Sequence, residues 1–202
     1  MLEFASLTAA AVCALGYLWL TGRPAGTLRS ATKTMAVMFL ALAAGLADAP
    51  ALLVLALVCC AVGDFCLSRD GEQFFVAGVG AFALGHLAYI GLFLNHPDSN
   101  PMHLLQLPQL TLAMMVVGLG LVMTWGLGPR AGALKGPVLC YIPIILGMGL
   151  AALTVPGQGS AVWLLPAALA FIVSDVVLAT ETFVLSSEHL ARRYTPYFIW
   201  VT

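Results

Sequence analysis

Charge is the scarcest property of this sequence. Only 8% of its 202 residues are Asp, Glu, Lys or Arg, whereas about a quarter of a soluble domain is charged. There is no run of basic residues of the kind that follows the phosphates of a nucleic acid, so we expect no nucleic-acid partner. The five cysteines lie in apolar segments, and their spacing matches neither a zinc site nor a disulfide framework. We therefore expect no metal site.

Apolar residues dominate instead. They make up 61% of the chain, which is more than a water-soluble fold buries, so the lipid bilayer must be the solvent. A spanning helix needs about 20 mostly apolar residues. We therefore predict an all-α, polytopic bundle of transmembrane helices that forms one domain over residues 1–202. The expected spans are residues 2–20, 32–48, 50–68, 73–94, 108–126, 136–154 and 161–185.

An eighth apolar segment begins near Tyr194, and the sequence ends at Thr202. A helix over these residues rises roughly 13 Å, which is less than half the thickness of the hydrocarbon layer. We expect eight spans, of which the eighth is truncated at the C-terminus. A short re-entrant segment is the alternative that the sequence leaves open.

The basic residues predict an orientation. When successive loops are placed alternately on two sides of the membrane, all Lys and Arg residues fall on the same side. The positive-inside rule makes that side cytoplasmic and places the N-terminus outside. We expect an integral protein of a cell membrane, such as the inner membrane of a bacterium. The basic residues are Arg23, Arg29, Lys33, Arg69, Arg130, Lys135, Arg192 and Arg193.

Two aspartates, Asp64 and Asp175, lie inside the apolar segments. An ionised carboxylate at the centre of a bilayer costs at least ~2.5–3.5 kcal/mol, so a helix keeps one only where it is paired, protonated or facing a polar cavity. Asp64 is expected roughly 7 Å from the inner end of its helix and Asp175 roughly 15 Å from the end of its own. We predict a functional pair; a carboxyl that only joins neighbouring helices is the alternative.

Other polar side chains occur at compatible depths. His86 and Tyr89 share a helical face with Gly78 and Phe82, although a lone buried histidine is often a satisfied core residue. We expect a group of supporting residues that orient water or the carboxyls. They are His86, Tyr89, Tyr141 and Ser174.

Lys33 opens the second apolar segment, where its side chain can extend to the membrane surface. It is either an anchor that fixes the topology or a contact for an anionic lipid headgroup. In the second interpretation Arg29 and Arg69 assist it as headgroup-binding residues.

The motifs around these residues resemble those of the YhhN-like family. Their order and spacing extend over nearly the whole chain, and Lys33 matches a lysine that opens the second helix of the family. Thr34 follows it here, where the family usually has proline. The matching runs are Gly63-Asp64-x-x-Leu67, then Phe75, Gly78, Phe82 and His86-x-x-Tyr89, then Tyr141 after Gly136-Pro137-Val138, and finally Phe171-x-x-Ser174-Asp175-x-x-Leu178-Ala179 with Phe183.

The resemblance implies an eight-span membrane enzyme, because that family contains lysoplasmalogenases. These enzymes hydrolyse the vinyl ether of lysoplasmalogens to a fatty aldehyde and glycerophosphoethanolamine or glycerophosphocholine. The resemblance also implies that Asp64 and Asp175 are the essential carboxylates. The last helix of the family continues into a Tyr-x-x-x-Gln pattern that this sequence does not reach.

Vinyl ether hydrolysis begins with protonation of the β-carbon, and water then adds to the oxocarbenium ion. Two carboxyls in different environments can divide the roles of acid and base, as they do in glycosidases. We predict the deeper Asp175 as the acid and Asp64, nearer to Arg69 and water, as the base, with the reverse order left open. The scheme requires no cofactor. Its partners are a lysophospholipid and the bilayer; the headgroup, the chain preference and the oligomeric state stay open.

Two other functions fit the same residues. In a proton-coupled transporter the aspartates would carry protons, but the sequence shows no convincing inverted repeat and no pair of broken helices. In a lipid-binding membrane protein the aspartates would only hold helices together. Without the family resemblance, the residues alone do not decide among enzyme, transporter and lipid binder.

Overall fold

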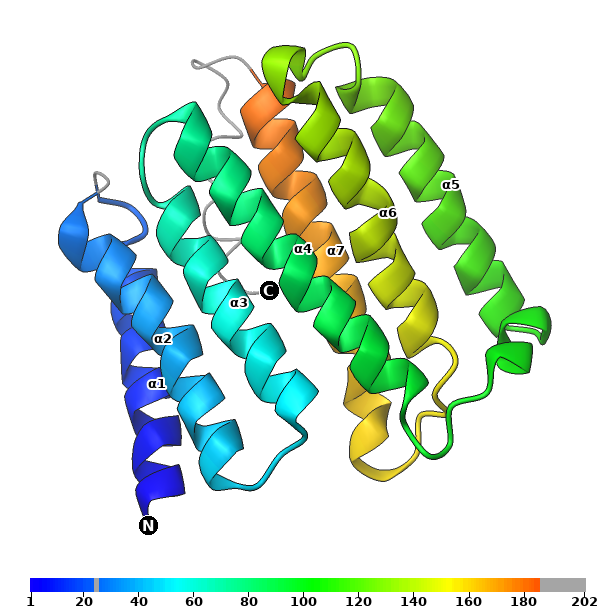
Figure 1. The fold of residues 1–202 in the computed structure, drawn as a ribbon, viewed down its shortest axis with the longest axis horizontal. Helices are drawn as coiled ribbons and strands as arrows, with labels where there is room; N and C mark the ends of the chain where they lie inside the picture. The colour runs from blue at the N-terminus through cyan, green and yellow to red at the C-terminus, as the bar shows by residue number, and fades with distance from the viewer. Residues whose placement is uncertain (24–25, 186–202) are drawn as a thin grey trace. The chain divides into compact units, whose positions relative to one another are not determined.

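The computed structural model of the protein describes residues 1–23 and 26–185. Over these residues the chain forms seven α-helices and three short 3-10 helices, with no strand (Figure 1). The all-α prediction is therefore confirmed. The helices are α1 (Leu2–Leu20), α2 (Thr27–Leu46), α3 (Ala51–Leu67), α4 (Glu72–Leu94), α5 (Gln109–Leu127), α6 (Lys135–Ala152) and α7 (Leu164–Phe183).

Five helical segments are long and apolar enough to cross a membrane, so this is an integral membrane protein. They are α1, α4, α5, and the helices α6 and α7 together with the 3-10 turns before them. Helix α3 is apolar but has only 17 residues, and α2 carries two basic side chains. The eight predicted spans therefore stay a prediction, and the segment from Tyr194 onward lies outside the described residues.

The start of α2 differs from the prediction. Apolar residues begin near position 32, but the helix begins at Thr27. Hydroxyl groups in this first part donate to the helix backbone, from Ser30 to the carbonyl oxygen of Gly26 at 3.2 Å and from Thr32 to that of Leu28 at 3.0 Å. The apolar residues therefore predicted where the part of α2 that is compatible with lipid begins. The helix itself begins about one turn earlier in the sequence.

The chain falls into two compact units, residues 1–89 and 90–202, with the border inside α4. In the first unit α2 lies between α1 and α3 (Figure 1). Successive helices of this unit run antiparallel, so the loop after α1 and the turn after α3 are at the same end. In the second unit α6 packs against both α5 and α7. That residues 1–202 form a single domain stays a prediction.

Glycines allow close helix packing in both units. In the first unit a Cβ on Gly63 of α3 would lie 2.5 Å from Cδ2 of Phe82 on α4. In the second unit a Cβ on Gly149 of α6 would lie 2.7 Å from Cδ1 of Ile172 on α7. Small residues at helix contacts are typical of membrane bundles, where packing rather than hydrophobic transfer holds the helices together.

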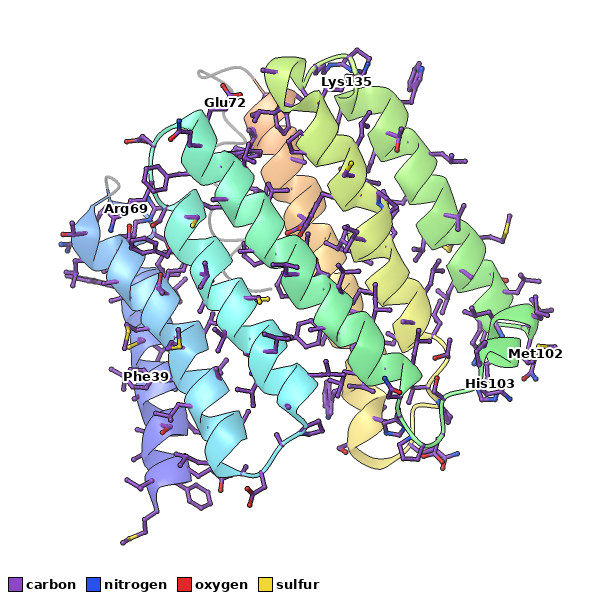
Figure 2. The ribbon with its side chains drawn as sticks, viewed as in Figure 1. Phe39, Arg69, Glu72, Met102, His103 and Lys135 are labelled. Atoms are coloured by element: carbon purple, nitrogen blue, oxygen red, sulfur yellow. The ribbon has the colours of Figure 1, made fainter. Side chains whose placement is uncertain are left out.

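The segment after α4 is fastened to the end of α6 by hydrogen bonds. The backbone N–H of Asn100 donates to the carbonyl oxygen of Thr154 at 2.9 Å, and the hydroxyls of Ser99 and Thr154 lie 2.7 Å apart. His103, labelled with Met102 in Figure 2, brings its Nδ1 to 3.2 Å from the same carbonyl oxygen. These bonds satisfy polar groups that would otherwise be exposed at the edge of the bilayer.

We predict that Gly63→Ala destabilises the protein. The added methyl group meets the Phe82 ring, and overpacking of this kind costs about 1–3 kcal/mol. A lower midpoint of thermal unfolding in detergent is the expected result. Gly80→Ala on α4 is the matched control, because nothing lies within 4 Å of its added Cβ. Equal midpoints for the two variants would contradict the close contact of α3 and α4.

Candidate functional site

Asp64 pairs with Lys33 in the first unit. Asp64 lies three residues before Leu67, the last residue of α3, and Lys33 lies in the second turn of α2. Their Nζ and Oδ1 atoms are 2.7 Å apart, and the Asp64 side chain is only 10% exposed. A charge-assisted hydrogen bond at this distance stabilises the carboxylate in an apolar setting. Asp64 is therefore held between two helices rather than left exposed to lipid.

This contact changes the interpretation of Lys33. The sequence predicted a topology anchor or a headgroup contact for it, and the structure places its ammonium group on a buried carboxylate. Lys33 is near the start of α2 and Asp64 near the end of α3, and because these helices run antiparallel both lie at the same end of the unit. This shared depth is the signal for a pair that the sequence contains. Whether Lys33 also binds a headgroup stays a prediction.

The other predicted headgroup residues lie at the same end of the first unit. Arg29 is one helical turn before Lys33, and its Nη1 donates to the carbonyl oxygen of Arg23 at 3.1 Å. Arg69 is in the turn between α3 and α4 (Figure 2), with its guanidinium 4.7 Å from the centroid of the Phe65 ring. The structure thus gathers basic groups around the end of the unit that holds Asp64.

His86 and Tyr89 are on α4, as the sequence predicted. His86 is fully buried, and its ring centroid lies 6.2 Å from that of Phe82 with an angle of 26° between the ring planes. Phe82 in turn contacts Gly63, the residue before Asp64. The Phe82 ring therefore connects His86 with the turn of α3 that carries Asp64. Tyr89 follows His86 by one turn and is half-buried.

Asp175 is bonded to Tyr141 in the second unit. The Tyr141 hydroxyl on α6 donates to Oδ2 of Asp175 on α7. Asp175 lies eight residues before Phe183, the last residue of α7, so it is roughly 12 Å from that helix end. Ser174 beside it is buried. The structure therefore brings one predicted supporting residue, Tyr141, directly onto a predicted catalytic carboxyl, while the roles of these residues stay predictions.

A proline stands close to this hydrogen bond. Pro143 lies inside α6, two residues after Tyr141. Proline has no backbone N–H, so the carbonyl of Leu139 loses its usual helical partner and the helix is locally weakened. Tyr141 thus lies in the turn of α6 that lacks this backbone hydrogen bond.

The two aspartates have chemically different partners. Asp64 is next to an ammonium group, whereas Asp175 accepts a hydrogen bond from a phenol. Among the residues that the structure describes, no group of three His, Cys, Asp or Glu side chains is arranged to hold a metal ion. A carboxylate beside an ammonium group and a carboxyl beside a phenol can transfer protons and stabilise charge.

The fold and these side chains define a polytopic, helical membrane protein in which each unit carries a partnered aspartate inside an apolar helix. The sequence profile of the YhhN family matches residues 28–202, and the chain belongs to this family. The resemblance drawn from the motifs is thus confirmed. Helix α1 lies before the matched residues.

A curated relative is similar to this chain. It is human lysoplasmalogenase TMEM86B, which is 36% identical over 151 residues. The alignment covers 70% of this chain and 57% of the relative, so this chain matches little more than half of that protein's length. No solved structure matches the chain.

We predict that Lys33→Met destabilises the protein by about 2 kcal/mol, because it leaves the Asp64 carboxylate without its cation. The double variant Lys33→Met with Asp64→Asn removes both charges and is expected to recover most of this loss. Denaturation midpoints of the two single variants and the double variant measure the coupling. Additive losses would contradict the ion pair.

We predict that Tyr141→Phe costs about 1–3 kcal/mol, because the hydrogen bond from this hydroxyl to the carboxyl of Asp175 is lost inside an apolar bundle. The expected observation is a lower unfolding midpoint in detergent. Cys140→Ala is the control, since the neighbouring Cys140 is exposed. The hydrogen bond is refuted if Tyr141→Phe unfolds at the wild-type temperature.

Proposed function

We propose that this protein is a lysoplasmalogenase, which hydrolyses the vinyl ether of a lysoplasmalogen to a fatty aldehyde and a glycerophospho-alcohol. The observation that carries the proposal is that each of two aspartates in apolar helices has a polar partner. Asp64 pairs with the Lys33 ammonium group, and Asp175 accepts a hydrogen bond from the Tyr141 phenol. Membership of the YhhN family and the similarity to a human lysoplasmalogenase support it.

The first step is protonation of the β-carbon by Asp175. The Tyr141 hydroxyl donates to Oδ2 of this carboxyl, so the proton to be transferred resides on the other oxygen. A neutral carboxylic acid suits the apolar helix, because an ionised side chain is costly inside a membrane. Transfer of the proton to carbon leaves Asp175 as a carboxylate and the lipid as an oxocarbenium ion.

The second step is addition of water with Asp64 as the base. The Lys33 ammonium group lies 2.7 Å from this carboxylate and pairs with it before the reaction. Asp64 takes a proton as the water oxygen bonds to the cationic carbon, which gives a neutral hemiacetal. Asp64 then returns its proton to the departing glycerol oxygen, and Asp175 takes the hemiacetal hydroxyl proton. Both carboxyls regain their starting states, and aldehyde and alcohol are released.

The remaining polar residues have supporting roles in this proposal. Arg29 and Arg69 bind the lipid phosphate, because Lys33 is already engaged by Asp64. His86, Tyr89 and Ser174 orient water or the reacting carboxyls. The basic end of the first unit faces the cytoplasm by the positive-inside rule, so the lysolipid enters from the inner leaflet, as in a bacterial inner membrane.

The test is hydrolysis of a lysoplasmalogen by the purified protein in detergent. Wild-type protein is expected to release fatty aldehyde, while Asp64→Asn and Asp175→Asn each lower the rate at least about a hundredfold. Asp70→Asn is the matched control, because Asp70 is exposed near the same end of α3. All variants are assayed well below their own unfolding midpoints.

The lysolipid with a saturated ether chain is the second control. It cannot form the oxocarbenium ion by protonation at carbon, so no product is expected from it. Full activity of either aspartate variant would refute the acid and base assignment. Absence of aldehyde from wild-type protein, together with uptake of a solute into liposomes driven by a pH gradient, would favour a transporter.

A further inference from the structure

Tyr17 of α1 contacts the cation that pairs with Asp64. Its ring centroid lies 5.9 Å from Nζ of Lys33 and also 5.9 Å from the guanidinium carbon of Arg29. The Tyr17 side chain is buried, with 8% of its surface exposed. Both distances are within the range at which a cation is attracted by the negative face of an aromatic ring.

The packing of α1 against α2 keeps this ring in place. Gly16, the residue before Tyr17, faces Thr32 of α2, because an added Cβ would lie at an ordinary contact distance of 3.9 Å from its methyl carbon. Thr32 is itself the residue before Lys33. The two helices therefore meet at the level of the ion pair, and Figure 1 shows α1 alongside α2.

Two effects oppose the fixed position of the Lys33 ammonium group beside Asp64. A lysine side chain has several rotatable bonds and loses rotamer entropy of roughly 1.5–2 kcal/mol when it is fixed. Arg29 is one helical turn away, and like charges at this spacing repel each other. The Tyr17 ring attracts both cations, so it offsets the repulsion and restricts the positions of the Lys33 ammonium group.

We propose that Tyr17 is a positioning residue for the Lys33–Asp64 pair, so that α1 takes part in the catalytic machinery although it lies outside the segment matched by the YhhN family. This inference rests on the proposed function only through the role of Asp64 as the base. Tyr17 acts through Lys33 and contacts no reacting atom.

The first test needs no substrate. Unfolding midpoints are measured for Tyr17→Leu in the wild-type and in the Lys33→Met background, with Leu20→Ala as the control. Leu20 is buried one turn further along α1. We expect the loss from Tyr17→Leu to shrink in the Lys33→Met background, and the loss from Leu20→Ala to be the same in both. Equal losses from Tyr17→Leu in the two backgrounds would overturn the inference.

The second test separates ring electrostatics from packing and avoids a large change of shape. Tyr17→Phe keeps the π face, whereas a trifluorinated phenylalanine at position 17 keeps the ring but removes its negative face. We expect kcat for lysoplasmalogen within about twofold of wild type for Tyr17→Phe, and roughly fivefold or more below it for the fluorinated variant. Equal kcat values for both variants would overturn the inference.

The two tests also distinguish this inference from the proposed function. If wild-type protein releases no aldehyde, the proposed function fails, and the unfolding cycle still decides whether Tyr17 supports the ion pair. If wild-type protein is active and the fluorinated variant is equally active, only the role of Tyr17 fails.

Discussion

A carboxyl group inside an apolar helix must have a partner, and much of the structure follows from this requirement. An unpaired carboxylate in lipid costs several kcal/mol, which is a large part of the stability of any small protein. In the first unit the partner is the Lys33 ammonium group, and in the second it is the Tyr141 hydroxyl. Each partner comes from a neighbouring helix, so helix packing and the state of the carboxyl depend on each other.

Close packing is therefore as important as the polar residues themselves. Gly63 admits the Phe82 ring next to Asp64, and Phe82 stacks on the buried His86. On the other side of α2, α1 packs at the level of Thr32, and the Tyr17 ring centroid lies 5.9 Å from Nζ of Lys33. Small residues such as Gly63 let neighbouring helices of a membrane protein approach each other closely.

Much of the fold was predictable, because in a membrane protein the length of an apolar run largely sets the length of a helix. The described helices occupy all seven predicted segments, and the largest shift, at the start of α2, occurs where polar residues continue the helix beyond the apolar run. Asp64 and Asp175 could also be selected from the sequence, since their cost in an apolar segment is evident without any structure.

Their partners were harder to predict. The pairing of Lys33 with Asp64 depends on how α2 and α3 are aligned along their axes, which no local sequence pattern predicts. The role of Tyr17 was not predicted, because a single tyrosine in an apolar helix is typical of an interfacial aromatic residue. Only the structure shows the Lys33 cation over its ring. Tyr141 was expected to support a carboxyl, but only the packing of α6 on α7 indicates which one.

The most direct test of carboxyl-catalysed vinyl ether hydrolysis is the isotopic composition of the aldehyde formed in D2O. Protonation of the β-carbon by a carboxyl that exchanges with solvent puts one deuterium on carbon 2 of the aldehyde, which mass spectrometry detects after immediate trapping. We predict one deuterium in each aldehyde released by the wild-type protein. Aldehyde that carries no solvent deuterium at carbon 2 would contradict protonation at carbon as the first step.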